Sequence, residues 1–287
     1  MKALQKLIVI CFVFGIIPAN LMAQSYFSDK VTKLWETPAE LKVPESAFYD
    51  RDNDVIYVSN INGNPSEKDG NGFISKIGAT GNIIKIDWIT GLNAPKGMNI
   101  YNGKLYVADI DCVVEIDVKT GKIFKTHQAK GAEFLNDVAA GYDGTIYISD
   151  MGTGAIYSIS NGEIKPWLPK GTFNRPNGLY FDEGNLFVGC KGSIQRVNPK
   201  TKEILEVLKI DGGIDGLEKD VDGNFIFSDW SGKVQIQKAG GEPVVLFNTT
   251  DAKINAADIH LIRSKNILLV PTFFDNRIVT YLMIKKF

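Results

Sequence analysis

The sequence predicts an all-β protein: a six-bladed β-propeller with four-stranded blades, its ring closed by an N-terminal strand. One pattern recurs along the chain, in which a short apolar strand leads through a Gly-containing turn to a second apolar strand ending in Asp or Asn. The copies follow one another at about forty residues, the length of a four-stranded blade. The 28 glycines, with β-branched and aromatic residues in short runs, also favour many short strands.

Each copy is expected to contain two inner strands, a third strand and a short fourth strand. The second strands are expected at residues 55–60, 105–109, 146–150, 186–189, 225–229 and 268–270. Asp143-Gly144 and Asp222-Gly223 stand between the first and second strands of their copies, where a tight hairpin turn is needed. The last copy ends near residue 282, with too little chain left for a fourth strand. Residues 31–36 alternate like a strand and are expected to fill that place, which removes an exposed sheet edge.

The N-terminus has the pattern of a signal peptide. Lys2 and Lys6 precede an apolar run at 7–17, and Ala23 stands just before Gln24. We therefore expect residues 1–23 to be removed after Ala23, leaving one propeller domain at 24–287 that is periplasmic or secreted. The alternative is an uncleaved membrane anchor, but the apolar run is short for a membrane span.

Composition and cysteine usage limit the possible partners. The net charge is -1 in 287 residues with 44% hydrophobic content, so nothing favours nucleic acid or an anionic membrane, and no membrane insertion is expected after cleavage. The oligomeric state is left open. Cys112 and Cys190 fall in non-adjacent copies, too far apart for a disulfide, so both are expected to be free, buried thiols.

The aligned copies share one column of residues at the start of the first strand. In a propeller this position faces the channel mouth, so the column becomes a ring of converging side chains. The ring consists of Glu45, Lys96, Asn136, Asn177, Asp215 and Ala257. Two carboxylates brought together in a channel cost repulsion and desolvation unless a cation is present.

Three ring residues offer only oxygen ligands, which hard cations prefer. Glu45, Asn177 and Asp215 therefore predict a site for one divalent cation, with Ca²⁺ preferred and Mg²⁺, Mn²⁺ or Zn²⁺ as alternatives. Three protein oxygens leave room for water or substrate, as in a catalytic site. The alternative is a mouth lined by water without any metal.

Four of the copies carry motifs that resemble the metal-site motifs of the gluconolactonase, regucalcin (senescence marker protein) and luciferin-regenerating-enzyme family of six-bladed propellers. These motifs are Pro44-Glu45-Ser46, Leu135-Asn136-Asp137, Arg175-Pro176-Asn177-Gly178-Leu179 and Ile214-Asp215-Gly216-Leu217. The resemblance implies hydrolysis of a small-molecule lactone or related ester. It also implies that Glu45, Asn177 and Asp215 hold the ion, that Asn136 faces the substrate or a metal-bound water, and that Asp215 serves as general base.

Other positions qualify this expectation. Phe134 stands where such lactonases often have an arginine that binds substrate hydroxyls, which favours a less polar lactone or ester. Lys96 is expected to bind an anionic substrate group, to pair with a ring carboxylate, or to be a solvated rim lysine. Asp137 and Asp258 occupy the next column, where a second ion or backbone hydrogen bonding can explain them. Trp230 follows a strand end and can reach the mouth.

Two other functions stay open. A non-catalytic propeller of the NHL type would bind a ligand or partner protein at the channel mouth, and fold alone does not choose between this and an enzyme. A propeller resembling strictosidine synthase or paraoxonase would keep the metal and change the substrate. No Gly-x-Ser-x-Gly element, P-loop or Cys-x-x-Cys pair is present, and His127 and His260 lack the serine or cysteine motif of a triad.

Overall fold

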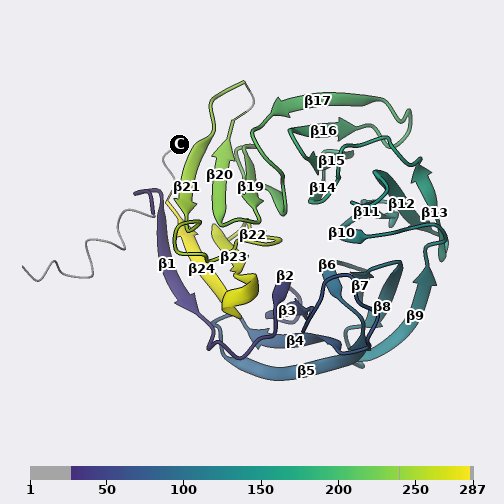
Figure 1. Ribbon diagram of the computed structural model, residues 1–287, viewed down its shortest axis with the longest axis horizontal. Coiled ribbons are helices and arrows are strands. Elements are labelled where there is room, and N and C mark those ends of the chain that lie inside the picture. Colours follow the sequence, from purple (N-terminus) through teal and green to yellow (C-terminus); the bar gives the residue numbers. More distant parts are fainter. Residues whose placement is uncertain (1–26, 239, 285–287) are drawn as a thin grey trace, which may run out of the picture.

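The repeated apolar strands form six four-stranded antiparallel sheets, arranged as blades around a central channel (Figure 1). The structure is a computed structural model that describes residues 27–238 and 240–284. Blades 1 to 3 consist of β2 (Pro44–Asp50), β3 (Val55–Asn60), β4 (Gly72–Gly78) and β5 (Ile83–Leu92); β6 (Pro95–Tyr101), β7 (Lys104–Asp109), β8 (Cys112–Asp117) and β9 (Lys122–Gln128); and β10 (Leu135–Ala140), β11 (Ile146–Asp150), β12 (Ala155–Ser160) and β13 (Glu163–Leu168).

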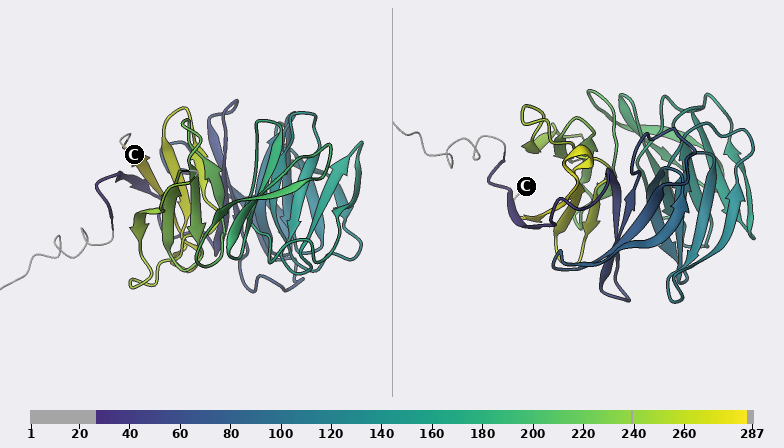
Figure 2. Two further views of the ribbon diagram at one scale, coloured as in Figure 1. Left: turned by 90° about the horizontal axis from the view of Figure 1, so that it is seen from above. Right: turned by 60° about the horizontal axis from the view of Figure 1, so that its bottom comes forward.

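The other three blades follow the same order from the channel outward. They consist of β14 (Leu179–Asp182), β15 (Asn185–Cys190), β16 (Ser193–Val197) and β17 (Ile204–Lys209); β18 (Leu217–Lys219), β19 (Phe225–Asp229), β20 (Lys233–Gln237) and β21 (Val244–Asn248); and β22 (His260–Ile262), β23 (Ile267–Pro271), β24 (Ile278–Met283) and β1 (Val31–Glu36). Seen edge-on in Figure 2, the strands run between two faces on which the connecting loops gather.

The N-terminal strand closes the ring, as the sequence predicts. β1 pairs antiparallel with β24, with Val31 opposite Met283 and Glu36 opposite Val279, and becomes the outermost strand of blade 6. The first and last strands of the propeller therefore share one sheet (Figure 1). This pairing gives the last blade its fourth strand and joins the two ends of the ring.

The fourth strands are not short, which corrects one expectation. β5 spans ten residues, and β9 spans seven. These outer strands have mostly exposed side chains, β9 exposing all but one of its seven residues. Their apolar signal in the sequence is therefore weak, and this is why their length was underestimated.

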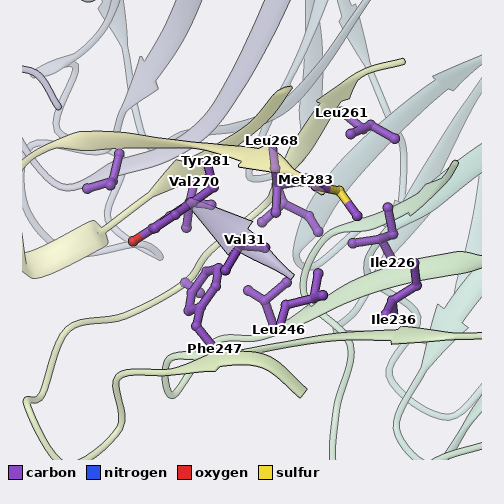
Figure 3. Close-up of a cluster of buried hydrophobic side chains, with 14 residues drawn as sticks. Val31, Ile226, Ile236, Leu246, Phe247, Leu261, Leu268, Val270, Tyr281 and Met283 are labelled. Carbon is purple, nitrogen blue, oxygen red and sulfur yellow. The ribbon is translucent and has the colours of Figure 1, made fainter. Parts of the chain in front are cut away.

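The hydrophobic core lies between the blades rather than in the channel. The largest cluster joins blades 5 and 6, where Ile226, Ile236 and Phe247 pack against Leu268 and Val31 (Figure 3). Similar clusters lie between each other pair of neighbouring blades. Because the apolar faces bury one another, the inner strands are free to direct polar side chains into the channel.

Cys112 and Cys190 are free and buried, as expected from their placement. Burial raises the pKa of each thiol to about 12, so both are neutral at physiological pH. The signal peptide predicted at 1–23 lies outside the described residues. Within 27–238 and 240–284, no helix has the length and apolar character needed to cross a membrane.

Candidate functional site

Irregular strand starts direct the first three ring residues into the channel. The pairing of the first two strands shifts register between Pro44 and Ser46 in blade 1, at the position of Glu45. The same shift surrounds Lys96 in blade 2 and Asn136 in blade 3. Such bulges turn a side chain away from regular alternation and are common beside functional sites.

The remaining ring residues precede their inner strands but are still held by backbone hydrogen bonds. The amide of Asn177 donates to the Gly189 carbonyl oxygen at 2.8 Å, and that of Asp215 donates to the Ser228 carbonyl oxygen at 2.8 Å. Ala257 is fully buried in a small apolar cluster. The backbone therefore fixes every position of the ring, even where no regular strand is formed.

The five polar ring residues line one cavity of about 510 Å³ at the channel mouth. Each of them is buried, with at most 7% of its surface exposed. The other walls are largely apolar and include Ile61, Pro65 and Phe134. The structure thus brings together the residues that the sequence assigned to the single cation and to the substrate, whereas Asp137 and Asp258 lie outside this cavity.

Three ring oxygens are buried without a hydrogen-bond partner. They are Glu45 Oε2, Asn136 Oδ1 and Asn177 Oδ1, and among the described residues only one other buried side-chain atom, on Gln237 outside the cavity, lacks a partner. Leaving such atoms unsatisfied is costly, and native proteins rarely do so without a ligand, ion or water. Carboxylate and carboxamide oxygens are the ligands that hard cations prefer, so these residues fit a divalent cation.

One hydrogen bond orders the ring further. The Asn177 side chain donates from Nδ2 to Asp215 Oδ1 at 2.6 Å. This bond uses the nitrogen of the amide and leaves Asn177 Oδ1 directed away from its partner. It also fixes the Asp215 carboxylate in one orientation.

The negative charges of the two ring carboxylates, Glu45 and Asp215, are only partly neutralised by the surrounding protein. Burial raises the pKa of Asp215 to about 7, against the lowering effect of the Asn177 hydrogen bond. Burial and the Asp215 charge also hold the pKa of Glu45 well above its usual range, although Lys96 opposes this shift. Additional positive charge is needed to keep both groups ionised. No cluster of three or more His, Cys, Asp or Glu suited to a metal occurs in the part of the chain that the structure describes, because amides complete the ring.

Lys96 is not a solvated rim lysine, and this corrects one of the expectations for it. Its side chain is 1% exposed, and Nζ donates to the Ala94 carbonyl oxygen at 2.7 Å. Nζ also lies 4.5 Å from the centre of the Phe134 ring. Burial lowers the pKa of Lys96 to about 8, while the Glu45 charge acts in the opposite direction. No ion pair with a carboxylate is present for Lys96 among the described residues.

Aspartates at the ends of the second strands hold the loops that carry the cavity wall. Asp150 accepts from the Phe134 amide at 2.9 Å and from the Thr153 hydroxyl at 2.6 Å. In blade 2, Asp109 accepts at 2.7 Å from the amide of Ala94, which immediately precedes β6. These hydrogen bonds cap the loops and fix Phe134 and the segment before Lys96.

Asp137 and Asp258 lie in the column below the ring and join neighbouring blades. Asp137 accepts from the Leu179 amide of blade 4 at 2.6 Å, and Asp258 accepts from the Ser46 hydroxyl of blade 1 at 2.6 Å. A Cβ at Gly97 would come within 2.2 Å of the Asp137 carboxylate, so only glycine leaves it room. Hydrogen bonding, one of the two expected roles, is thus what the structure shows.

An aromatic group at the mouth was only partly anticipated. Trp230 reaches the cavity as expected, and its ring lies 5.4 Å from that of Phe273 and 6.0 Å from that of Phe274, edge to face. Phe274 is 63% exposed. Phe273 begins the 3-10 turn η1 (Phe273–Asp275) between β23 and β24. Two adjacent phenylalanines after a strand were the available sequence signal.

Two cations on the wall were also missed. Arg175 and Lys191, both exposed, line the cavity from blade 4, together with Met151 of blade 3. Arg175 stands inside the Arg-Pro-Asn-Gly motif quoted for Asn177, so its proximity to the ring was readable from the sequence. Lys191 lies in the turn after β15 and carries no comparable signal.

No protein-family model and no curated protein matches the sequence. Solved structures match over most of the chain. A gluconolactonase from Xanthomonas campestris has a TM-score of 0.66 at 15% identity, covering 93% of this chain and 94% of its own. A second, predicted gluconolactonase has a TM-score of 0.64 at 14% identity, covering 91% and 95%.

A similar match is to an inactive variant of virginiamycin B lyase from Staphylococcus aureus with quinupristin. Its TM-score is 0.62 at 15% identity, and the match covers 89% of this chain and 99% of the lyase. At these identities the similarities establish the propeller fold that the gluconolactonases share with this chain. They do not choose between hydrolase and lyase chemistry, because one fold carries many functions.

Proposed function

We propose that the protein is a hydrolase of a lactone or related ester that depends on one divalent cation, with Ca²⁺ as the first choice. The observation that carries the proposal is the set of three buried, unpaired oxygens on Glu45, Asn136 and Asn177 at the floor of an open cavity. A non-catalytic binding surface does not require such a set beside a buried carboxylate. Water alone can satisfy these atoms, so the proposal is tested by cation dependence.

Glu45, Asn177 and Asp215 would hold the cation, and Asn136 would face the substrate. When bound, the cation supplies positive charge that polarises an ester carbonyl and stabilises the developing oxyanion. The same charge satisfies the unpaired oxygens and removes the cost of ionising Glu45 and Asp215 in the buried ring.

Asp215 would act as the general base. The Asn177 hydrogen bond holds its carboxylate in one orientation, so the carboxylate can accept a proton from the attacking water. Water adds to the carbonyl carbon, the ester C–O bond breaks, and the proton returns to the leaving oxygen. General-base assistance of this kind contributes about 10²- to 10⁴-fold in rate.

The walls favour a substrate less polar than a sugar lactone. Phe134 lies beside the ring, and Ile61, Trp230 and Phe273 add apolar surface. A polyhydroxylated ring would leave its hydroxyls without partners on these walls, which costs binding free energy. The two gluconolactonase structures support lactone chemistry, while the wall argues against gluconolactone itself.

The placement of the two histidines supports a hydrolase over a lyase. The virginiamycin B lyase structure is of a variant made catalytically inactive by replacing a histidine with alanine. Neither histidine of this chain lines the proposed cavity: His127 pairs with Glu115 at 2.9 Å, and His260 pairs with Glu218 at 2.8 Å below the ring. This observation favours a carboxylate as the base here.

The test is a screen of lactones and aryl esters after chelation and addition of Ca²⁺, Mg²⁺, Mn²⁺ or Zn²⁺. We expect hydrolysis only with added cation, and loss of hydrolysis in Asp215→Asn with the fold intact by circular dichroism. Asn136→Ala should raise KM more than it weakens cation binding. Asp211→Asn, an exposed carboxylate near the same loop, is the matched control. Full activity in Asp215→Asn would exclude Asp215 as the base, whereas the absence of hydrolysis with every added cation would favour a non-catalytic propeller.

A further inference from the structure

The cavity has two chemically different walls. Blades 5, 6 and 1 contribute an apolar wall that includes the aromatic group of Trp230, Phe273 and Phe274. Blade 4, which lies between blades 3 and 5 (Figure 1), contributes Arg175 and Lys191. A ligand that fills the cavity therefore meets both aromatic rings and two cations.

The two cations are placed together by the backbone. The Lys191 amide donates to the Asn174 carbonyl oxygen at 2.9 Å, and Asn174 Nδ2 donates back to the Lys191 carbonyl oxygen at 3.2 Å. The loop of Arg175 is thereby tied to the turn of Lys191. Arg175 also has a left-handed backbone with φ of 50°, a conformation that costs energy in a residue other than glycine and is common at functional sites.

Neither cation is neutralised by the protein. The Arg175 guanidinium makes a weak contact, donating to Met151 Sδ at 3.6 Å. Among the described residues, neither Arg175 nor Lys191 forms an ion pair with a carboxylate. Two unpaired cations on a cavity wall attract an anionic group of the ligand.

The acids that line the same cavity do not pair with these cations. Asp229 Oδ1 accepts from the Ser231 amide at 2.9 Å and from the Ser231 hydroxyl at 2.6 Å, which closes its own turn. Glu45 and Asp215 lie in the ring at the floor, beside Lys96. The positive charge of blade 4 is therefore available to a ligand.

We propose that the substrate is a lactone or ester with an aromatic body and a free carboxylate. Its carboxylate binds Arg175 and Lys191, its aromatic body packs against Trp230 and Phe274, and its ester carbonyl faces the ring. Arginine binds carboxylates through two parallel hydrogen bonds, and edge-to-face packing suits exposed aromatic rings. A cavity of about 510 Å³ accommodates a molecule of this size. The ester part rests on the proposed function, whereas carboxylate binding does not.

Binding is tested first, without turnover. The probes are 3-phenylpropanoate and the uncharged 3-phenylpropanamide, titrated calorimetrically into the cation-loaded protein. We expect the carboxylate to bind at least about tenfold more tightly than the amide, with an affinity that falls as salt rises. Arg175→Gln and Lys191→Gln should each weaken binding of the carboxylate and leave the amide unchanged. Lys209→Gln, on the outer strand of blade 4, should change neither.

Turnover is tested with a dihydrocoumarin that carries a carboxylate and with the matching carboxamide. The carboxylate should be hydrolysed with the higher kcat/KM, and Arg175→Gln should remove that preference mainly through KM. Equal binding of both probes, unaffected by Arg175→Gln, would overturn this inference. Carboxylate binding without hydrolysis of any lactone or ester would instead refute the proposed function. Asp215→Asn distinguishes the carboxylate-binding inference from the proposed function, since this variant should keep carboxylate binding and lose hydrolysis.

Discussion

Replacing Asp215 with asparagine should stabilise the cation-free protein, although it should abolish activity. Asp215 is a buried carboxylate whose pKa is raised from 3.8 to about 7, chiefly by burial. The folded protein therefore binds this proton more tightly than the unfolded chain does. Its stability should fall as pH rises from about 4 to about 7 and stay level above that range. Asparagine has nearly the same shape, bears no charge and retains an oxygen that can accept the bond from Asn177.

The size of the effect follows from the pKa shift. A rise from 3.8 to about 7 corresponds to a cost of at most about 4 kcal/mol once the group is fully ionised. Most of this cost develops between pH 5 and pH 7, so the advantage of Asp215→Asn over the parent should be about 3 kcal/mol larger at pH 8 than at pH 5. Coupling to Glu45 will distribute part of this change between the two carboxylates.

The assay is urea denaturation in excess chelator at pH 5, 6, 7 and 8, with Asp211→Asn as the exposed control. A cation at 100 times its Kd should stabilise the parent by about 2.7 kcal/mol, which removes most of the advantage of Asp215→Asn at pH 8. If the difference between Asp215→Asn and the parent were independent of pH in chelator, the electrostatic account of the ring would be wrong.

Three further outcomes are expected. Chelation should lower the melting temperature of the parent, measured by differential scanning fluorimetry. Glu45→Gln should lose most of the cation-induced rise in melting temperature, because a carboxamide is a poorer ligand for a hard cation. An unchanged rise would exclude Glu45 as a cation ligand. Gly97→Ala should destabilise the fold by about 1–3 kcal/mol, because its Cβ would lie 2.2 Å from the Asp137 carboxylate. Gly213→Ala, which has open space around it, should not destabilise the fold. The urea denaturation midpoints of the two variants and the parent measure the difference. The exported protein should begin at Gln24 by N-terminal sequencing, and a membrane-bound, uncleaved chain would contradict this.

The blades could be predicted because each carries its own local signals. Turn pairs such as Asp143-Gly144 mark the hairpins, and buried second strands such as β11 read as continuous apolar runs. The alignment of the copies then placed the ring residues at one position of each blade. Closure by β1 followed because the last copy lacked a strand and one unassigned strand remained.

The cavity wall could not be predicted in the same way. Lys191 and Phe274 lie in loops that differ from blade to blade, so no alignment of repeats groups them. The burial of Lys96 depends on Phe134, which another blade supplies and the Asp150 carboxylate fixes. These are tertiary contacts between loops, and local propensity carries no information about them.

The net charge of the ring depends on Glu45, Asp215 and the buried Lys96, and it determines how strongly the ring would attract a cation. Glu45 and Asp215 together carry two negative charges when ionised, and Lys96, with its pKa lowered to about 8, offsets at most one of them. Without a cation, the ring therefore reduces its charge by holding a proton, and this proton competes with cation binding. A divalent cation would replace that proton and change the net charge of the floor from zero, with Lys96 charged, to positive. On the proposed function, the loaded floor would attract the oxyanion that develops on an ester carbonyl. The uncompensated carboxylates that destabilise the empty ring would thus be the groups that make the loaded ring catalytic.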